Sequence, residues 1–235
     1  MRRLGDYDRA APLCEKGLAL SRELGDNRYA AWFLIHFGIV ALQQSHYAEA
    51  TRLFEEALTL GRESQDQWWI CLGLNHLAEV VLREGNYAQA AGYFSESLTL
   101  ARELGDKYLI AYILRYWGEV DLRRGNYEQA AARYTEGLTV ACELGARREI
   151  EGCIDGLAQL ACANGDYEQA GRLFGATETL RAALGLRREA VEQAHHDQRV
   201  AATRAALGKE SFDAAWAKGR AMTLEQANEY ALAHV

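Results

Sequence analysis

The sequence predicts an all-α protein, a solenoid of antiparallel helix pairs closed at its C-terminal end by further helices. The first observation is a forty-residue period in near-copies of "RRGNYEQAA", whose tyrosines are Tyr7, Tyr47, Tyr87, Tyr127 and Tyr167. Periods of about 20–50 residues are typical of stacked units that bury their apolar faces against their neighbours. The second observation is composition. A single proline in 235 residues, with abundant Ala, Leu, Glu and Arg, favours long helices.

Two helices are predicted in each repeat, as residues 106–145 illustrate. The stretch "DKYLIAYILRYWGEVDLRRG" carries apolar residues at helical spacing, and "YEQAAARYTEGLTVACELG" does so again. At the corner between them, Gly125 suits a left-handed residue after a helix. Asn126 is expected to cap the next helix, with Gln129 completing a capping box. The same device is expected elsewhere, at Asn86 with Gln89, at Asp166 with Gln169 and, more weakly, at His46 with Glu49.

A second corner separates one repeat from the next. It reads "RELGD" at 22–26 and 102–106, "CELGA" at 142–146 and a degenerate "RESQD" at 62–66. The glycine ends one helix, and Asp26, Asp66 or Asp106 is expected to cap the following one. The predicted organisation is a partial repeat at 1–25, full repeats at 26–65, 66–105, 106–145 and 146–185, and a C-terminal helical cap at 186–235.

The C-terminal cap departs from the period. Helices are predicted from about Arg187 to Leu207, at "ESFDAAWAKGRA" and at "TLEQANEYALA", where Thr223 and Gln226 form a capping box. An open solenoid needs a terminal segment of different pattern, because the apolar face of its last repeat is otherwise exposed.

Composition and charge also limit which functions and which cellular compartment we expect for the chain. A net charge of −7 and a pI near 5.5 argue against binding of nucleic-acid phosphates. Five cysteines without a CxxC pair indicate buried, reduced thiols. The N-terminus has no apolar stretch of a secretory signal. The longest apolar run, residues 29–42, is shorter than the roughly twenty residues of a membrane span. We therefore expect a cytoplasmic protein that contacts neither membranes nor nucleic acids.

Catalytic, cofactor and metal motifs are absent from the sequence, so we expect no catalytic residue, no cofactor and no metal. His195, His196 and Asp197 form the only dense cluster of ligand types. Adjacent helical residues point about 100° apart, which favours a solvated polar face over a metal site. His36 and His76 occupy the same position of successive repeats and are interpreted, like the repeating tyrosines, as packing residues. An enzyme is only a minor alternative.

Seven positions in each full repeat resemble the tetratricopeptide repeat family. In one repeat they are Leu114, Trp117, Gly118, Tyr127, Ala130, Tyr134 and Gly137. The resemblance implies a right-handed solenoid in which small residues let the paired helices approach closely, here Gly38, Ala78, Gly118 and Ala158. Two features depart from the family: the period is forty residues instead of about thirty-four, and the closing proline is missing. Both helices are therefore longer, and the curvature of the superhelix is left open.

The C-terminal stretch carries a second resemblance. "RLFGATETLRAALG" and the cap that follows are similar to the extreme C-terminus of bacterial multidomain signalling ATPases and LuxR-type transcriptional regulators, in which an NTPase module precedes such an array. At the other end, Tyr7 belongs to the second helix of a repeat whose first helix is missing. We interpret the chain as a fragment of a longer protein, the alternative being that this helix simply packs on the next repeat.

The family resemblance implies a binding surface. First helices of such repeats line a concave groove that binds a protein or peptide, and aromatic residues with Arg and Asn between them suit recognition. The positions carried over are Trp32, Ile35, Trp68, Asn75, Glu79, Arg83, Tyr108, Tyr112, Arg115, Glu119, Arg123, Asp155 and Gln159.

Two alternatives to that surface stay open. The aromatic residues could pack between helices, and Arg115 could form an internal ion pair with Asp155 or Glu119. The predicted function is a protein- or peptide-binding module, part of a larger bacterial signalling protein. The alternative function is self-association through unpaired ends or convex faces.

Overall fold

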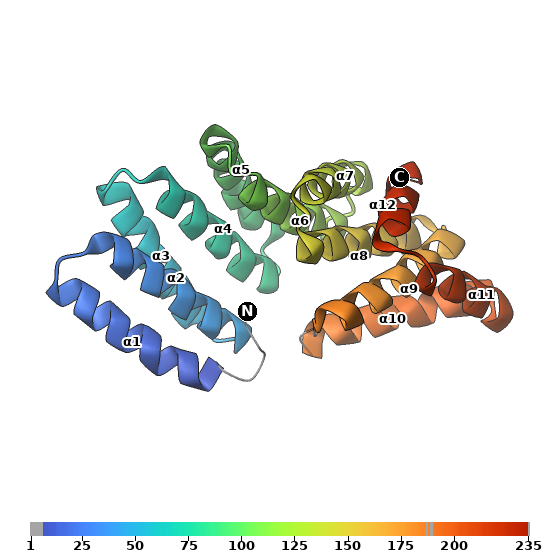
Figure 1. The fold of residues 1–235 in the computed structure, drawn as a ribbon, viewed down its shortest axis with the longest axis horizontal. Coiled ribbons are helices and arrows are strands. Elements are labelled where there is room, and N and C mark those ends of the chain that lie inside the picture. Colours follow the sequence, from blue (N-terminus) through green and yellow to red (C-terminus); the bar gives the residue numbers. More distant parts are fainter. Residues whose placement is uncertain (1–6, 187, 189, 235) are drawn as a thin grey trace. The chain divides into compact units, whose positions relative to one another are not determined.

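The computed structural model describes residues 7–186, 188 and 190–234, and these form twelve helices and no strand (Figure 1). Consecutive helices pack in pairs, so the predicted all-α class with helix-pair packing is confirmed. The chain divides into two compact units, an N-terminal unit (Met1–Asp106) and a C-terminal unit (Lys107–Val235).

The N-terminal unit is a run of helices in which each packs on the next, and α2 also contacts α4. The helices are α1 (Tyr7–Glu23), α2 (Asn27–Gln43), α3 (Tyr47–Glu63), α4 (Gln67–Arg83) and α5 (Tyr87–Leu104). In Figure 1 they follow one another from blue to green. The middle helix pairs are covered on both sides, which makes α4 the most buried helix of this unit.

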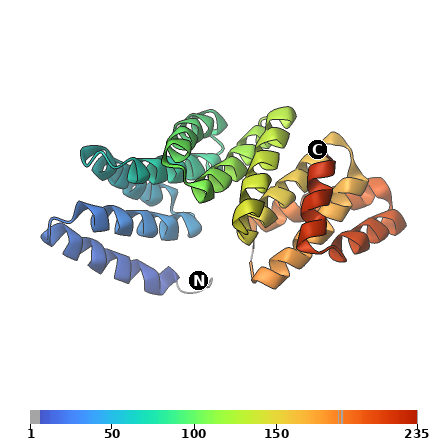
Figure 2. The same ribbon diagram turned by 45° about the horizontal axis from the view of Figure 1, so that its top comes forward.

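The C-terminal unit continues the pairing and then changes pattern. Its paired helices are α6 (Lys107–Arg123), α7 (Tyr127–Leu144), α8 (Arg147–Asn164) and α9 (Tyr167–Leu184). The last three helices are α10 (Ala190–Leu207), α11 (Lys209–Arg220) and α12 (Leu224–Ala233). Helices α10 and α11 pack on α9, and α12 contacts α7, α8 and α9 (Figure 2). The predicted first residue of α10, Arg187, lies outside the described residues.

Glycines at the corners adopt the predicted left-handed conformation. The φ angle is +78° at Gly125, and it is also positive at Gly25, Gly85, Gly105, Gly145, Gly165 and Gly185. Two corners have no glycine, and there Ser45 and Gln65 take φ of 62° and 53°. Side chains with a Cβ are strained in this region, so the repeat geometry overrides residue preference at both corners.

The capping predictions are only partly confirmed. Asp26 and Asp66 accept backbone N–H groups of the helices that follow them, as predicted. Asn86 and Asp166 accept the backbone N–H of Gln89 and Gln169 at 3.3 and 3.1 Å. Their capping boxes are nevertheless wrong, because the Gln89 side chain accepts from Asn86 Nδ2 and the Gln169 side chain donates to a carbonyl at the end of α12.

The caps predicted at Asn126, His46 and Thr223 have different outcomes. The predicted box at Asn126 is also wrong, since the side chain of Asn126 makes no capping bond. His46 makes none either, in keeping with its weak prediction. Thr223 and Gln226 form a complete capping box at the start of α12, as predicted.

Close helix approaches depend on small residues. A Cβ at Gly38 would overlap the ring of Phe54, and a Cβ at Gly118 would lie 2.7 Å from the ring of Tyr134, which confirms the predicted role of both glycines. At the C-terminal end, a Cβ at Gly219 would overlap the carbonyl oxygen of Arg172, so α11 lies directly against the backbone of α9. The packing of α11 on α9 therefore tolerates no side chain at this point.

All five cysteines are free thiols. Cys14, Cys71 and Cys153 are buried as predicted, whereas Cys142 and Cys162 are half-buried. Burial raises the pKa of the Cys71 and Cys142 thiols above the usual value. Because only the thiolate is nucleophilic, this shift makes both groups less reactive than an ordinary cysteine.

Candidate functional site

Three of the predicted groove residues are not exposed, and the expectation of exposure is wrong for them. The side chains of Ile35, Asn75 and Glu79 are buried. Asn75 Nδ2 donates to Glu79 Oε1 at 3.3 Å, and His76 Nδ1 lies 2.8 Å from the same oxygen. The cause is the position of α4, which packs against α2, α3 and α5 so that every residue from 71 to 82 is buried.

Aromatic residues near the N-terminal ends of first helices are exposed. Trp32 on α2 is 40% exposed and Trp68 on α4 is 38% exposed, and in the C-terminal unit Tyr108 on α6 is 48% exposed. The Trp32 ring stacks on His36 with 3.9 Å between centroids, and Trp68 Nε1 donates to Asp106 Oδ2 at 3.4 Å. These contacts orient the two indole rings while a large part of each remains accessible to a partner.

Arg83 and Tyr112 are half-buried on their first helices. Tyr112 lies between two other rings of α6, with centroids 6.4 Å from Tyr108 and 4.9 Å from Tyr116. The tyrosine rings of α6 therefore pack against one another, and Tyr108 is also open to solvent. Packing and availability to a partner, the two interpretations of the aromatic residues, each hold in part.

Arg115 on α6 forms an internal ion pair, but with a partner that the sequence did not indicate. Its Nε donates to Glu149 Oε2 at 2.7 Å, and the Tyr108 hydroxyl donates to Glu149 Oε1 at 3.3 Å. Asp155 and Glu119, the expected partners, pair with other residues. Glu149 is fully buried on α8, so Arg115 supplies the charge that compensates a carboxylate removed from water.

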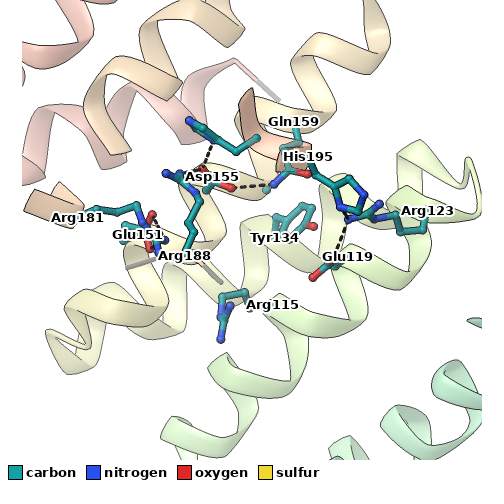
Figure 3. Close-up of a pocket in the computed structure, with 13 residues that line it drawn as sticks. Arg115, Glu119, Arg123, Tyr134, Glu151, Asp155, Gln159, Arg181, Arg188 and His195 are labelled. Atoms are coloured by element: carbon teal, nitrogen blue, oxygen red, sulfur yellow. Dashed lines mark hydrogen bonds and ion pairs between the residues drawn. The ribbon is translucent and has the colours of Figure 1, made fainter. Parts of the chain in front are cut away.

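A polar cavity of about 100 Å³ opens in the C-terminal unit (Figure 3). Five predicted groove residues meet in its wall: Arg115, Glu119, Arg123, Asp155 and Gln159. The other wall residues come from α7, α8, α9, α10 and the α9–α10 connection: Tyr134, Glu151, Gly152, Gly156, Arg181, Arg188, His195 and His196. The remaining predicted groove residues lie outside this cavity.

Two glycines on α8 create the hollow. In the three preceding repeats, the position of Gly152 holds Trp32, Leu72 and Tyr112, and the position of Gly156 holds His36, His76 and Tyr116. A Cβ at Gly152 would overlap the side chain of Arg115, and a Cβ at Gly156 would overlap the ring of Tyr134. The absence of side chains at these two positions therefore lets Arg115 and Tyr134 lie against α8 and leaves space beside them.

Ion pairs tie the helices around the cavity together. Arg181 Nη1 on α9 lies 2.9 Å from both oxygens of Glu151 on α8. Arg188 Nη2 donates to Asp155 Oδ1 at 2.6 Å, and Gln159 Nε2 donates to Asp155 Oδ2 at 2.7 Å (Figure 3). Glu151 and Asp155 thus connect α8 to α9 and to the α9–α10 connection.

Glu151 and Asp155 of α8 differ in their proton affinity. Burial, and then the charge of Asp155, raise the pKa of Glu151 to about 7. Burial alone would raise the pKa of Asp155 as well, but His196 and the Arg188 guanidinium outweigh it and hold this pKa well below its usual range. At neutral pH, Asp155 is therefore ionised, whereas Glu151 binds its proton for part of the time.

The opposite wall carries Arg123 and the histidines of α10. Arg123 Nη2 donates to Glu119 Oε1 at 3.2 Å and lies 3.3 Å from His195 Nδ1. His196 is buried, with Nδ1 3.6 Å from Asp155 Oδ1, so the interpretation of this cluster as a solvated face is wrong for His196. Asp197 is exposed, and for this residue the interpretation is right.

Sequence reasoning missed several wall residues, and two signals could have found them. Glu151, Arg181 and Arg188 give no periodic signal of their own. The paired glycines of α8, at positions that hold large residues in the other repeats, mark a hollow. Tyr134 is the second signal, because the same position holds Phe54, Phe94 and Phe174 in the other repeats, and the extra hydroxyl needs an explanation.

Membrane-spanning helices and metal-binding clusters are both absent from the described residues. No helix among them is both long and apolar enough to cross a membrane. Within the same residues, no group of three or more His, Cys, Asp or Glu side chains is arranged to hold a metal ion.

Known proteins resemble this chain in sequence pattern and in fold. The tetratricopeptide repeat pattern matches residues 1–63 and 69–143. No curated protein sequence matches the chain. Among solved structures, the crystal structure of BtubC (BKLC) from P. vanneervenii superposes with a TM-score of 0.66 at 17% identity, over 97% of this chain and 91% of that one. At this identity the likeness concerns the fold alone. Since the family pattern covers more than half of the residues, the chain belongs to the tetratricopeptide repeat family.

Proposed function

We propose that the chain is a cytoplasmic protein- or peptide-binding module whose first helices carry the contact surface. The observation that carries the proposal is the exposure of Trp32 and Trp68 on two first helices, α2 and α4, that pack against each other in the N-terminal unit. Tryptophan is enriched where interfaces gain most of their binding energy, because it buries a large surface with few rotatable bonds. Membership of a family whose repeats generally bind proteins or peptides supports this role.

The test uses peptides selected on the protein itself. A random peptide library displayed on phage is selected against the immobilised chain, and the affinities of enriched peptides are measured for the wild type and for a Trp32→Ala/Trp68→Ala variant. Loss of two aromatic anchors is expected to weaken binding at least tenfold, about 1.4 kcal/mol. Tyr127→Ala is the matched control, because Tyr127 is 40% exposed but lies on a second helix.

Two results would overturn the proposal. One is the absence of any enriched peptide. The other is equal loss of affinity in the Tyr127→Ala control, which would place the contact surface on the second helices or make it unspecific. Circular dichroism of each variant establishes that the fold is unchanged before affinities are compared.

We further propose that this module is the sensing part of a larger bacterial signalling protein. The support is the resemblance of the last repeat and the cap to the C-termini of signalling ATPases and LuxR-type regulators. The coding sequence upstream of Met1 tests the idea. An NTPase module in the same reading frame is expected, and a stop codon directly upstream would contradict it.

Self-association is a second candidate, and a specific observation favours it. Leu13, Leu20, Leu24 and Tyr29 are the four most exposed large hydrophobic side chains of the described residues, and all lie on α1, at its end or on the first turn of α2. Leu53, forty residues after Leu13, is fully buried. A second copy could cover the apolar face of α1 as neighbouring helices cover α3.

Light scattering over a hundredfold range of concentration tests self-association. A dimer through α1 predicts a mass that rises with concentration and falls to the monomer value in Leu13→Glu/Leu20→Glu. A wild type of constant monomer mass would exclude this candidate and leave the peptide-binding proposal untouched.

A further inference from the structure

The cavity of the C-terminal unit has more hydrogen-bond donors than its own acceptors use. Arginine carries five N–H groups and no acceptor. In the hydrogen bonds of the described residues, Arg123, Arg181 and Arg188 each use a single nitrogen, Nη2, Nη1 and Nη2 respectively. Both oxygens of Asp155 and both oxygens of Glu151 are already engaged. Among the described residues, N–H donors of these three arginines therefore remain without an acceptor.

The charge of the wall points the same way. Its four arginines have four carboxylates beside them, namely Glu119, Glu151 and Asp155 in the wall and Glu149 as the partner of Arg115. Glu151 loses part of its charge at neutral pH, because burial raises its pKa to about 7. In a chain of net charge −7, the partial protonation of Glu151 leaves a local excess of positive charge, which attracts an anion.

Two polar groups of the cavity wall, the Tyr134 hydroxyl and His196 Nδ1, have no hydrogen-bonding partner among the described residues. Tyr134 as a whole residue is 2% exposed, and His196 is also buried. Buried polar groups are normally paired, since an unpaired one destabilises the folded state. Phenylalanine stands at the position of Tyr134 in three other repeats, so the hydroxyl in the wall is particular to this repeat.

We propose that this cavity binds a small oxyanion, the carboxylate or phosphate group of a small molecule, with the Tyr134 hydroxyl and the Arg123 guanidinium among its donors. Charge-assisted hydrogen bonds from arginine and tyrosine suit such a group in geometry and strength. The volume of about 100 Å³ has room for several water-sized groups and none for a folded peptide segment. This site goes beyond the peptide-binding function and does not depend on it, because Trp32 and Trp68 lie in the other unit.

The experiment is isothermal titration of the full chain with inorganic phosphate and, separately, with succinate. Sodium chloride of matched ionic strength is the blank for general salt effects. Saturable binding of one equivalent of at least one anion is expected. Tyr134→Phe and Arg123→Gln should each weaken that binding about tenfold, since each removes a charge-assisted hydrogen bond. Tyr134→Phe is expected to fold, because phenylalanine occupies this position in three other repeats.

Matched controls separate the cavity from the surface. Tyr127→Phe removes a hydroxyl from an exposed tyrosine of the same helix, and Arg204→Gln removes an exposed arginine that pairs with Asp213 at 2.7 Å. Both controls should bind like the wild type. The proposal is overturned if neither anion binds saturably, or if the cavity variants bind as tightly as the controls. Binding of a glutamate-rich peptide without either free anion would likewise overturn the assignment to a small molecule.

Discussion

At the residue scale, the corners between helices show how little a capping pattern says about the cap itself. Asn86 and Asn126 stand in the same sequence context, each three residues before a glutamine, yet only Asn86 accepts the backbone N–H of the helix that follows. Both corners already have a backbone hydrogen bond that closes the turn, from Asn86 to Val81 and from Asn126 to Asp121. The glycine and this backbone hydrogen bond therefore fix the conformation of the corner, and the side-chain hydrogen bond of Asn86 only adds to its stability.

The two asparagines give a matched prediction. Asn86→Ala removes a capping bond and should lower the free energy of unfolding by about 1 kcal/mol, whereas Asn126→Ala should cost only a few tenths. Urea unfolding followed by circular dichroism measures both. Equal losses would mean that the Asn126 side chain caps its helix in solution.

The corner at Gln65 gives a prediction of opposite sign. Its φ of 53° is unfavourable for a residue with a Cβ, so Gln65→Gly should raise the free energy of unfolding by about 0.5–1 kcal/mol despite the extra freedom of glycine in the unfolded chain. Ser64→Gly is the control, since Ser64 has φ of −83° and glycine there should destabilise. If Gln65→Gly is as destabilising as the control, the left-handed conformation at this corner is incorrect.

Single site residues were predictable only where the repeat itself carried the signal. Trp32 follows from a family contact position, and Trp68 and Tyr108 follow from the extra turn that the longer repeat adds before it, although the sequence left their exposure open. The ion pair of Arg115 does not follow from the repeat, because Glu149 occupies a position that holds the uncharged residues Tyr29, Trp69 and Leu109 in the three preceding repeats. Long-range pairing of this kind depends on distances between helices, which a period in the sequence does not supply.

At the element scale, helix limits follow closely from the corner motifs, whereas exposure does not. The predicted helices of residues 106–145 appear as α6 and α7 with ends set by Gly125 and Gly145. Exposure depends on which side chains fill the space around each position, and not on the number of neighbouring helices. Helix α4 buries Asn75 and Glu79, whereas the corresponding positions on α6 and α8 are half-buried around the cavity that Gly152 and Gly156 help to line.

The ion pair between α6 and α8 is the contact whose removal should matter most at this scale. Arg115→Ala leaves the fully buried Glu149 without its cation and should cost about 3 kcal/mol. Replacing both partners with the apolar residues of equivalent positions, Arg115→Ile with Glu149→Leu, should cost less than the single change. Guanidinium unfolding of the two variants checks this order. A stable Arg115→Ala protein would make Arg115 a surface residue available to a partner.

At the scale of the whole molecule, the C-terminal helices differ from the repeats in how they pack. Helix α11 lies against the backbone of α9 through Gly219, and Phe212 and Ala215 are buried in this contact. The sequence indicated that residues 186–235 leave the period, but not that their histidines and Arg188 would complete a cavity with α6 and α8. Such assembly from distant segments has no local sequence signature.

Deletion of residues 186–235 should uncover the face of α9 that α10 and α11 cover. Exposure of one or two large apolar side chains costs about 3 kcal/mol, which for a chain of this size lowers the melting temperature by about 6–12 °C. Thermal unfolding and light scattering of the truncated chain measure the loss and the expected aggregation. A monomeric truncated protein with an unchanged melting temperature would show that these helices do not act as a cap.

Hydroxyl-radical footprinting with a selected peptide bound shows directly whether the first helices carry the contact surface. The method oxidises accessible aromatic side chains, and mass spectrometry reads each one. Trp32, Trp68 and Tyr127 are comparably exposed in the free protein and should be oxidised comparably, allowing for the intrinsic reactivity of each ring. A peptide bound to the first helices should protect Trp32 and Trp68 on α2 and α4, while Tyr127 at the start of α7 stays as reactive as before. Protection of Tyr127 with unchanged oxidation of the two tryptophans would contradict a contact surface on the first helices.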